Sequence, residues 1–294
     1  MKKGHRENTV GPWAAQKLDA LEDYLRYYNT ALKKQNFKRI YIDAFAGSPI
    51  SRLRGKETIS DPVTFFEETE DSEAQQQFIL GSPFRALQLP NGFHHYYFFD
   101  LDESRAQTLN DLCKEVENVT VRVGDCNPLI QGLATELSNP NVRGVAFLDP
   151  YGAHLEWETI RALAATSTME VIINFPVAMA INRLITRSGD VPDNWSDQLN
   201  RCFGTEEWRE IAYHVSKDLF GEEIVEKQGS VPNRLLDLYM RRLRDLFSYV
   251  ATPRLIRNTK GAPLYYLIWA GPNKLGLKGA DHILRQGEIV KRQR

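Results

Sequence analysis

Hydrophobic residues along the chain gather in short apolar runs separated by stretches with helical spacing. Five of these runs end at an acid, a glycine or a proline, near residues 40–43, 93–102, 119–125, 144–152 and 169–176. Between them, apolar residues recur every three or four positions, as over residues 12–34, which predicts amphipathic helices. This alternation of strands and helices indicates an α/β fold with a largely parallel sheet.

The remaining segments complete a single predicted domain over residues 1–294. Two late apolar runs, 248–257 and 263–270, flank Asn258-Thr-Lys-Gly261 and predict a hairpin whose last strand is antiparallel. Helical spacing over 178–185 and 194–220 predicts a helical cap insertion at 176–232. Residues 57–73 hold seven acids and no base, so residues 50–80 are predicted to be an acidic surface insertion.

Composition narrows the class of protein. The 42% hydrophobic and 26% charged residues are typical of globular proteins. No apolar run approaches the roughly 18 residues of a membrane span, and the charges of the first six residues precede no apolar core, so we expect a soluble cytoplasmic protein. Cys113, Cys126 and Cys202 form no CxxC pair and the six histidines form no HExxH cluster, so no metal site is predicted.

Charge is unevenly distributed, although the net charge is only −1. Residues 231–294 contain thirteen Lys or Arg against four Asp or Glu. A basic quarter of this kind can contact nucleic acid phosphates. It can equally consist of solvated helix faces and a basic tail, and the sequence leaves both interpretations open.

The loop after the first apolar run is the clearest candidate for ligand binding. In Tyr41-Ile-Asp-Ala-Phe-Ala-Gly-Ser-Pro49 an acid is followed by small residues, which let backbone N–H groups approach a ligand. The Asp-x-Phe-x-Gly pattern resembles the first motif of S-adenosylmethionine (AdoMet)-dependent methyltransferases. The cofactor-binding candidates here are Asp43, Phe45, Ala46, Gly47 and Ser48. G-x-G-x-x-G is absent, which argues against a nicotinamide cofactor.

Further acids follow the second and third runs. Asp100 and Asp102 end the second run, where a carboxylate can accept hydrogen bonds from both ribose hydroxyls. Asp125 follows the third run, where folds of this kind place an acid beside the adenine amino group. Each acid can instead cap the helix that follows. Lys17, near the start of the helix preceding the first run, either reaches the cofactor or is a surface lysine.

The fourth run ends in Asp149-Pro-Tyr-Gly152, which is expected to lie at the same edge of the sheet as the loop after the first run. Proline ends the strand, and a carboxylate beside it can hold an amino group that receives a methyl group. The motif resembles the Asp/Asn-Pro-Pro-Tyr of amino methyltransferases and, more closely, the Asp-Pro-Phe-Gly of tRNA guanine-N2 methyltransferases. Asp149, Pro150 and Tyr151 are therefore the catalytic candidates, with Tyr151 able to stack on a planar ring. The alternative is a simple strand-terminating turn.

Taken together, the motifs resemble the three-Cys-motif partner protein family (TcmP) over nearly the whole chain. They are Trp13…Lys17-Leu18…Leu21, Tyr41-Ile-Asp-Ala-Phe-Ala-Gly47, Gly81-Ser-Pro83, Tyr97-Phe-Phe-Asp-Leu-Asp102, Phe147-Leu-Asp-Pro-Tyr-Gly152, Asn174-Phe-Pro176 and Leu264-Tyr-Tyr-Leu267. The resemblance implies a Rossmann-like class I methyltransferase sheet of seven strands, the last one antiparallel. It also implies a partner that carries a three-cysteine, radical-AdoMet-like motif. Pro49 departs from the family's Ala-Gly-Ser-Gly and removes one loop N–H.

Three functions are compatible with these features. The first is an AdoMet-dependent methyltransferase acting on an exocyclic nitrogen of a nucleic acid base. The second is a non-catalytic or partner-dependent AdoMet-binding subunit that works with the three-cysteine protein, which the Pro49 departure favours. The third, a metal-dependent nuclease, ranks last because the acids fall one per strand end instead of forming a cluster.

Overall fold

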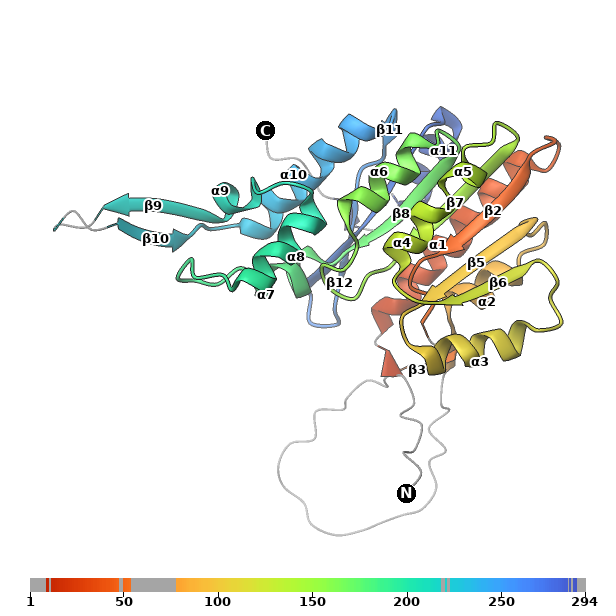
Figure 1. Cartoon of the computed structure of the whole chain (residues 1–294), viewed down its shortest axis with the longest axis horizontal. Helices are drawn as coiled ribbons and strands as arrows, with labels where there is room; N and C mark the ends of the chain where they lie inside the picture. Colours follow the sequence, from red (N-terminus) through yellow and green to blue (C-terminus); the bar gives the residue numbers. More distant parts are fainter. Residues whose placement is uncertain are drawn as a thin grey trace, which may run out of the picture.

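One large sheet forms the centre of the protein (Figure 1). The computed structural model describes residues 9–10, 12–47, 50–53, 78–217, 220, 223–284, 286 and 288–289. Within these residues the sheet has nine strands: β2 (Lys38–Asp43), β5 (His95–Asp100), β6 (Val119–Val123), β7 (Val142–Leu148), β8 (Met169–Phe175), β11 (Tyr249–Val250), β12 (Arg254–Arg257), β13 (Pro263–Gly271) and β14 (Glu288–Ile289). Their order is β14-β12-β13-β8-β7-β2-β5-β6, and β11 pairs with β13.

Strand direction identifies the fold class. β6, β5, β2, β7 and β8 are mutually parallel, whereas β13 is antiparallel to both β8 and β12. The order β6-β5-β2-β7-β8-β13-β12 with its reversal at β13 is that of a class I methyltransferase sheet, so the predicted fold class is confirmed. The stretch predicted as one strand at 248–257 forms two, β11 and β12, with Pro253 between them.

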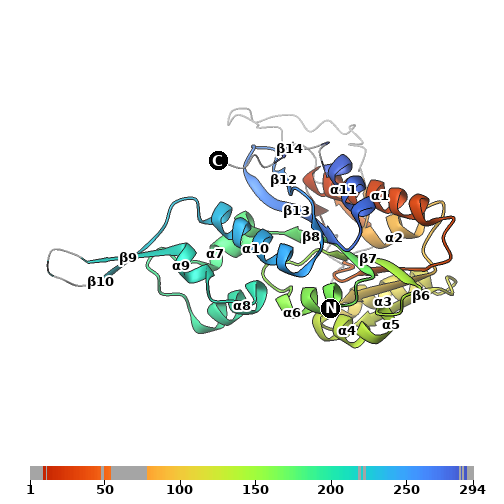
Figure 2. The same cartoon turned by 90° about the horizontal axis from the view of Figure 1, so that it is seen from above.

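Helices cover both faces of the sheet, as Figures 1 and 2 show. One face is packed by α1 (Pro12–Leu32), α2 (Ser82–Leu87), α3 (Glu103–Cys113) and α11 (Lys274–Leu284). The other is packed by α4 (Cys126–Gly132), α5 (Ala134–Leu137), α6 (Trp157–Ala165) and α10 (Val231–Leu246). Alternation along β2 explains the two layers, because Ile40 and Ile42 join one core and Tyr41 joins the other.

The predicted cap at 176–232 is helical only in part. It contains the π-helical turn η1 (Val177–Ile181), α7 (Asn182–Leu184), α8 (Asp193–Phe203), α9 (Trp208–Ala212) and two strands, β9 (Tyr213–Lys217) and β10 (Glu223–Lys227). The prediction of helical structure over 194–220 therefore holds for α8 and α9 and is wrong at β9. Gly204 ends α8 in the left-handed conformation at φ 63°. The antiparallel ribbon of β9 and β10 extends away from the body of the molecule (Figures 1 and 2).

The predicted acidic insertion at 50–80 is described only at its ends. β3 (Ile50–Leu53) and β4 (Phe78–Leu80) pair with each other, and β3 also pairs with the short strand β1 (Thr9–Val10). The acidic stretch between them lies outside the described residues. In the described part of the chain, no helix is both long enough and apolar enough to cross a membrane.

Candidate functional site

The loop after β2 lies at the carboxyl edge of the sheet, and its backbone is held by the neighbouring strands. The N–H of Ala44 donates to the Phe147 carbonyl at 3.0 Å, and that of Ala46 donates to the Phe99 carbonyl at 2.8 Å. Gly47 has φ 64°, a conformation that favours glycine. The loop candidates are thus placed at the strand ends as the sequence predicted, except Ser48, which lies outside the described residues.

Asp43 is a core carboxyl and does not face solvent. Its side chain is fully buried, and the hydroxyl of Tyr41 donates to Oδ2 at 3.3 Å. Burial, with a smaller effect from the Asp149 charge, raises the Asp43 pKa to about 7. Its predicted contact with the cofactor remains a prediction.

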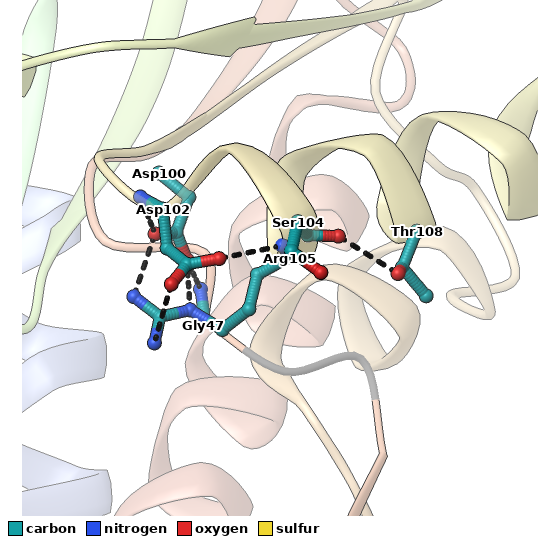
Figure 3. A network of polar contacts seen from close by, with 6 residues as sticks. All are labelled: Gly47, Asp100, Asp102, Ser104, Arg105 and Thr108. Carbon is teal, nitrogen blue, oxygen red and sulfur yellow. Dashed lines mark hydrogen bonds and ion pairs between the residues drawn. The ribbon is translucent and has the colours of Figure 1, made fainter. Parts of the chain in front are cut away.

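Asp100, at the end of β5, is the centre of the polar network in Figure 3. It is only 5% exposed, and its carboxylate accepts hydrogen bonds from the Gly47 N–H at 2.9 Å and the Asp102 N–H at 2.8 Å. Arg105 of α3 adds a bidentate contact, with Nε at 3.0 Å from Oδ2 and Nη2 at 2.8 Å from Oδ1. Asp100 therefore joins the first loop to α3, and a ribose would compete with Arg105 for its oxygens.

Asp102 and Asp125 act as helix caps. The Asp102 carboxylate accepts from the Arg105 N–H at 2.9 Å and caps α3, which Figure 3 also shows. The Asp125 carboxylate accepts from the N–H of Asn127 at 2.9 Å and caps α4. Of the two acids at the end of β5, Asp100 is thus the one directed at the loop after β2. A ligand role for Asp125 remains a prediction beside its observed capping.

Asp149, after β7, lies where three distant segments meet. Its Oδ2 forms an ion pair with Lys17 of α1, and its Oδ1 accepts from Asn174 Nδ2 at 2.6 Å. Lys17 also lies over the ring of Tyr265, 5.6 Å from its centre, and burial raises the Tyr265 pKa. The structure therefore brings together Lys17 and Asp149, two of the predicted site residues, at the sheet edge.

The two residues after Asp149 differ sharply in exposure. Pro150 is buried, whereas Tyr151 is 88% exposed, among the most exposed large side chains described. Gly152 follows with φ 86°, which turns the backbone back toward the body. Tyr151 is therefore free to meet a planar group from solvent, and its stacking role remains a prediction.

Three residues at this edge were missing from the predicted site. Asn174 carries a signal in the sequence, because its strand ends in Asn-x-Pro, and its buried Oδ1 has no hydrogen-bond partner within the described residues. Asn127 links the loops after β6 and β7 by donating to the His154 carbonyl at 2.9 Å. Arg105 sits in an ordinary amphipathic helix, so nothing in its local sequence indicates its contact with Asp100.

The arginines of α10 contact their own chain. Arg241 forms an ion pair with Glu207, while Arg242 lies over the Trp157 ring at 4.8 Å and donates to the Gly204 carbonyl at 3.1 Å. These contacts favour the interpretation of the basic quarter as helix surface, and nucleic acid binding remains a prediction. Among the described residues, no group of three or more His, Cys, Asp or Glu could hold a metal ion.

Comparison with known structures supports the fold assignment. A Legionella pneumophila protein of family model DUF519 superposes with a TM-score of 0.50 and 14% identity, covering 92% of this chain and 90% of that chain. This likeness shows the fold. A putative methyltransferase from Escherichia coli gives a TM-score of 0.34 at 10% identity, covering 84% and 83% of the two chains. A putative S-adenosylmethionine-dependent methyltransferase from Listeria monocytogenes gives 0.37 at 11% identity, covering 87% and 100%.

Sequence comparison adds nothing to these structures. No protein-family model matches the chain, and no curated protein matches it. The chain is therefore assigned a class I methyltransferase-like fold, and its resemblance to TcmP remains a prediction.

Proposed function

We propose that this protein is an AdoMet-dependent methyltransferase that modifies an exocyclic nitrogen of a nucleic acid base. The observation that carries the proposal is the cluster of Lys17, Asp149 and Asn174 at the carboxyl edge, beside the loop held by Asp100. In sheets of this kind ligands bind outside the carboxyl ends of the strands, where the order of connection reverses. Here that point lies between β2 and β7.

The residues present fit the cofactor. Asp100 has a carboxylate in reach of the first loop, as a ribose diol requires, and Gly47, whose N–H is bonded to that carboxylate, carries no side chain of its own. Bound AdoMet would supply an electrophilic methyl group. The chain's own contribution is to hold the acceptor, and the carboxylate of Asp149 can accept a hydrogen bond from an amino N–H. That contact directs the nitrogen lone pair, and such positioning contributes up to about 7–11 kcal/mol in the best cases.

Calorimetric titration of AdoMet and S-adenosylhomocysteine into the purified protein tests the pocket. We expect micromolar binding that Asp100→Ala weakens at least tenfold and that Asp102→Ala leaves unchanged, because Asp102 caps α3. Asp125→Ala tests the predicted adenine contact in the same series. Loss of affinity in Asp102→Ala, with Asp100→Ala unaffected, would reverse the assignment of the two acids.

Transfer of labelled methyl from AdoMet to total RNA and to DNA tests the reaction. Asp149→Ala should abolish transfer while AdoMet still binds, because its carboxylate is assigned to the acceptor. Asp149→Asn keeps an acceptor oxygen at the same place and should lose less activity. Full turnover by Asp149→Ala would exclude this role.

A second candidate is a partner-dependent AdoMet-binding subunit. The contacts of Asp100 and Asp149 favour it, because side chains of this chain already contact both oxygens of each acid. Arg105 contacts the two oxygens of Asp100. Lys17 and Asn174 each contact one oxygen of Asp149. The resemblance to TcmP suggests a radical-AdoMet-like protein with a three-cysteine motif as the partner. AdoMet binding only in the presence of that class of protein would support this candidate over the first.

A further inference from the structure

A cavity lies at the opposite, amino edge of the sheet. Its volume is about 160 Å³, and it lies between the start of β8 and the helices α1 and α11, which pack side by side (Figure 2). Glu170 is the second residue of β8 and lines this cavity, whereas Asn174 of the proposed methyltransferase site is near the other end of the strand. Four residues along a strand separate the two by roughly 13 Å. The cavity is therefore distinct from that site.

Glu170 is a buried carboxyl without a countercharge. It is 5% exposed, and among the residues that the structure describes no Lys or Arg forms an ion pair with it. Its Oε2 accepts from the hydroxyl of Tyr24 at 2.5 Å. A Cβ at Gly276 would lie 2.5 Å from its Oε1, so glycine at this position lets α11 pack closely against the carboxyl.

One residue that lines the cavity has a buried hydroxyl without a partner in the described part of the chain, and its oxygen can accept a hydrogen bond. Tyr28 is 5% exposed and lines the cavity, and its hydroxyl has no hydrogen-bond partner among the described residues. Buried polar groups nearly always have a partner, and one without a partner calls for an explanation such as a bound molecule. Tyr27 contributes a second phenol ring to the wall.

The carboxyl of Glu170 and the rings of Tyr27 and Tyr28 indicate the kind of ligand that the cavity can bind. A buried carboxylate is stabilised by an adjacent cation, and aromatic rings attract ammonium groups. Arg143 also lines the cavity, but its guanidinium lies over the Phe37 ring at 4.2 Å, its Nη1 donates to two backbone carbonyls, and among the described residues it forms no ion pair with Glu170. A bare metal ion would need more oxygen ligands than one carboxyl supplies.

The volume of the cavity limits the size of the ligand that it can hold. A volume of 160 Å³ equals about five water molecules at roughly 30 Å³ each, well below the 300–1,000 Å³ of drug-sized sites. We propose that this cavity binds a small organic cation, an ammonium or methylammonium group, with Glu170 as its countercharge and Tyr27 and Tyr28 as its walls. Burial raises the pKa of Glu170 to about 7, and an adjacent cation would restore its ionised form.

Titration calorimetry of the full chain with methylammonium and tetramethylammonium chloride tests the proposal, with sodium chloride at matched ionic strength as the blank. We expect saturable binding of both at millimolar concentration, weakened at least tenfold by Glu170→Gln, which keeps the shape and removes the charge. Tyr28→Phe should weaken methylammonium a few-fold and leave tetramethylammonium unchanged, because the latter has no N–H to donate to the hydroxyl.

Two controls separate this site from the rest of the protein. Asp100→Ala, at the other edge of the sheet, should bind both cations as the wild type does. Glu170→Gln should retain the circular dichroism spectrum and unfold cooperatively, so that its lost binding is not lost folding. The proposal would be overturned if the wild type gave no saturable heat, or if folded Glu170→Gln bound the cations equally well. The cavity would then hold only ordered water.

Discussion

Removing the guanidinium of Arg105 is expected to tighten AdoMet binding. Arg105 makes two hydrogen bonds to Asp100, at 3.0 and 2.8 Å, and the ribose must displace at least one of them. Hydrogen bonds to charged groups contribute about 1.5–3 kcal/mol when shielded, but Arg105 is 49% exposed and water replaces part of this. We take about 1–1.4 kcal/mol as the cost that Arg105→Ala removes, which corresponds to a fivefold to tenfold lower Kd.

The assay is calorimetric titration of AdoMet into Arg105→Ala and Arg105→Lys. Lysine keeps the charge but loses the bidentate fork, so its Kd should fall between those of the wild type and the alanine variant. Arg161→Ala is the matched control, because Arg161 pairs with Glu158 on the surface of α6, far along the chain from Asp100. Weaker binding by Arg105→Ala would contradict this prediction and make Arg105 a residue that holds the cofactor.

The remaining predictions concern stability, measured by urea unfolding. In the folded protein the pKa values of Asp43 and Glu170 are both raised to about 7, so as pH rises the unfolded chain loses these protons before the folded protein does. The free energy of unfolding should therefore fall as pH rises from about 4 to 7. Glu170→Gln should reduce this fall by up to roughly 3 kcal/mol. Gly204→Ala should cost about 2–3 kcal/mol, because φ is 63° and its Cβ would lie 2.4 Å from an indole ring, whereas Gly132→Ala, with open space, should cost nothing. Asp102→Ala should cost about 1 kcal/mol through the lost cap of α3, with an unchanged Kd for AdoMet.

The sheet was predictable because most of its parallel strands are apolar runs with a polar residue, glycine or proline at or just after their end. β2, β5, β7 and β8 are largely buried and read as hydrophobic segments, whereas the edge strand β6 is partly exposed; the carboxyl ends of all five share one edge. This places Asp43, Asp100 and Asp149 at that edge from sequence alone. The antiparallel last strand was predicted from the turn residues between the two late apolar runs, and the structure confirms it in β13.

Prediction failed where spacing was ambiguous or contacts were long-range. Residues 213–217 alternate between apolar and polar over only four positions, and residues 223–227 do not alternate, so the ribbon of β9 and β10 was missed. The choice between Asp100 and Asp102 depended on the helix boundary, because the residue before the first turn becomes its cap. The partnership of Lys17 with Asp149 joins positions 132 apart in sequence, which no local pattern encodes.

The two acids at the carboxyl edge differ in what a ligand must displace. Asp100 is almost fully buried and already accepts from two backbone N–H groups besides Arg105, so it has little capacity left and the arginine must move for a ribose to bind. Asp149 is 20% exposed and has one partner on each oxygen, whereas a carboxylate can accept about four hydrogen bonds. An acceptor amine can therefore bind Asp149 while Lys17 stays in place. In the proposed function, cofactor binding would therefore be coupled to a rearrangement of Arg105 in α3, and acceptor binding would require none at α1.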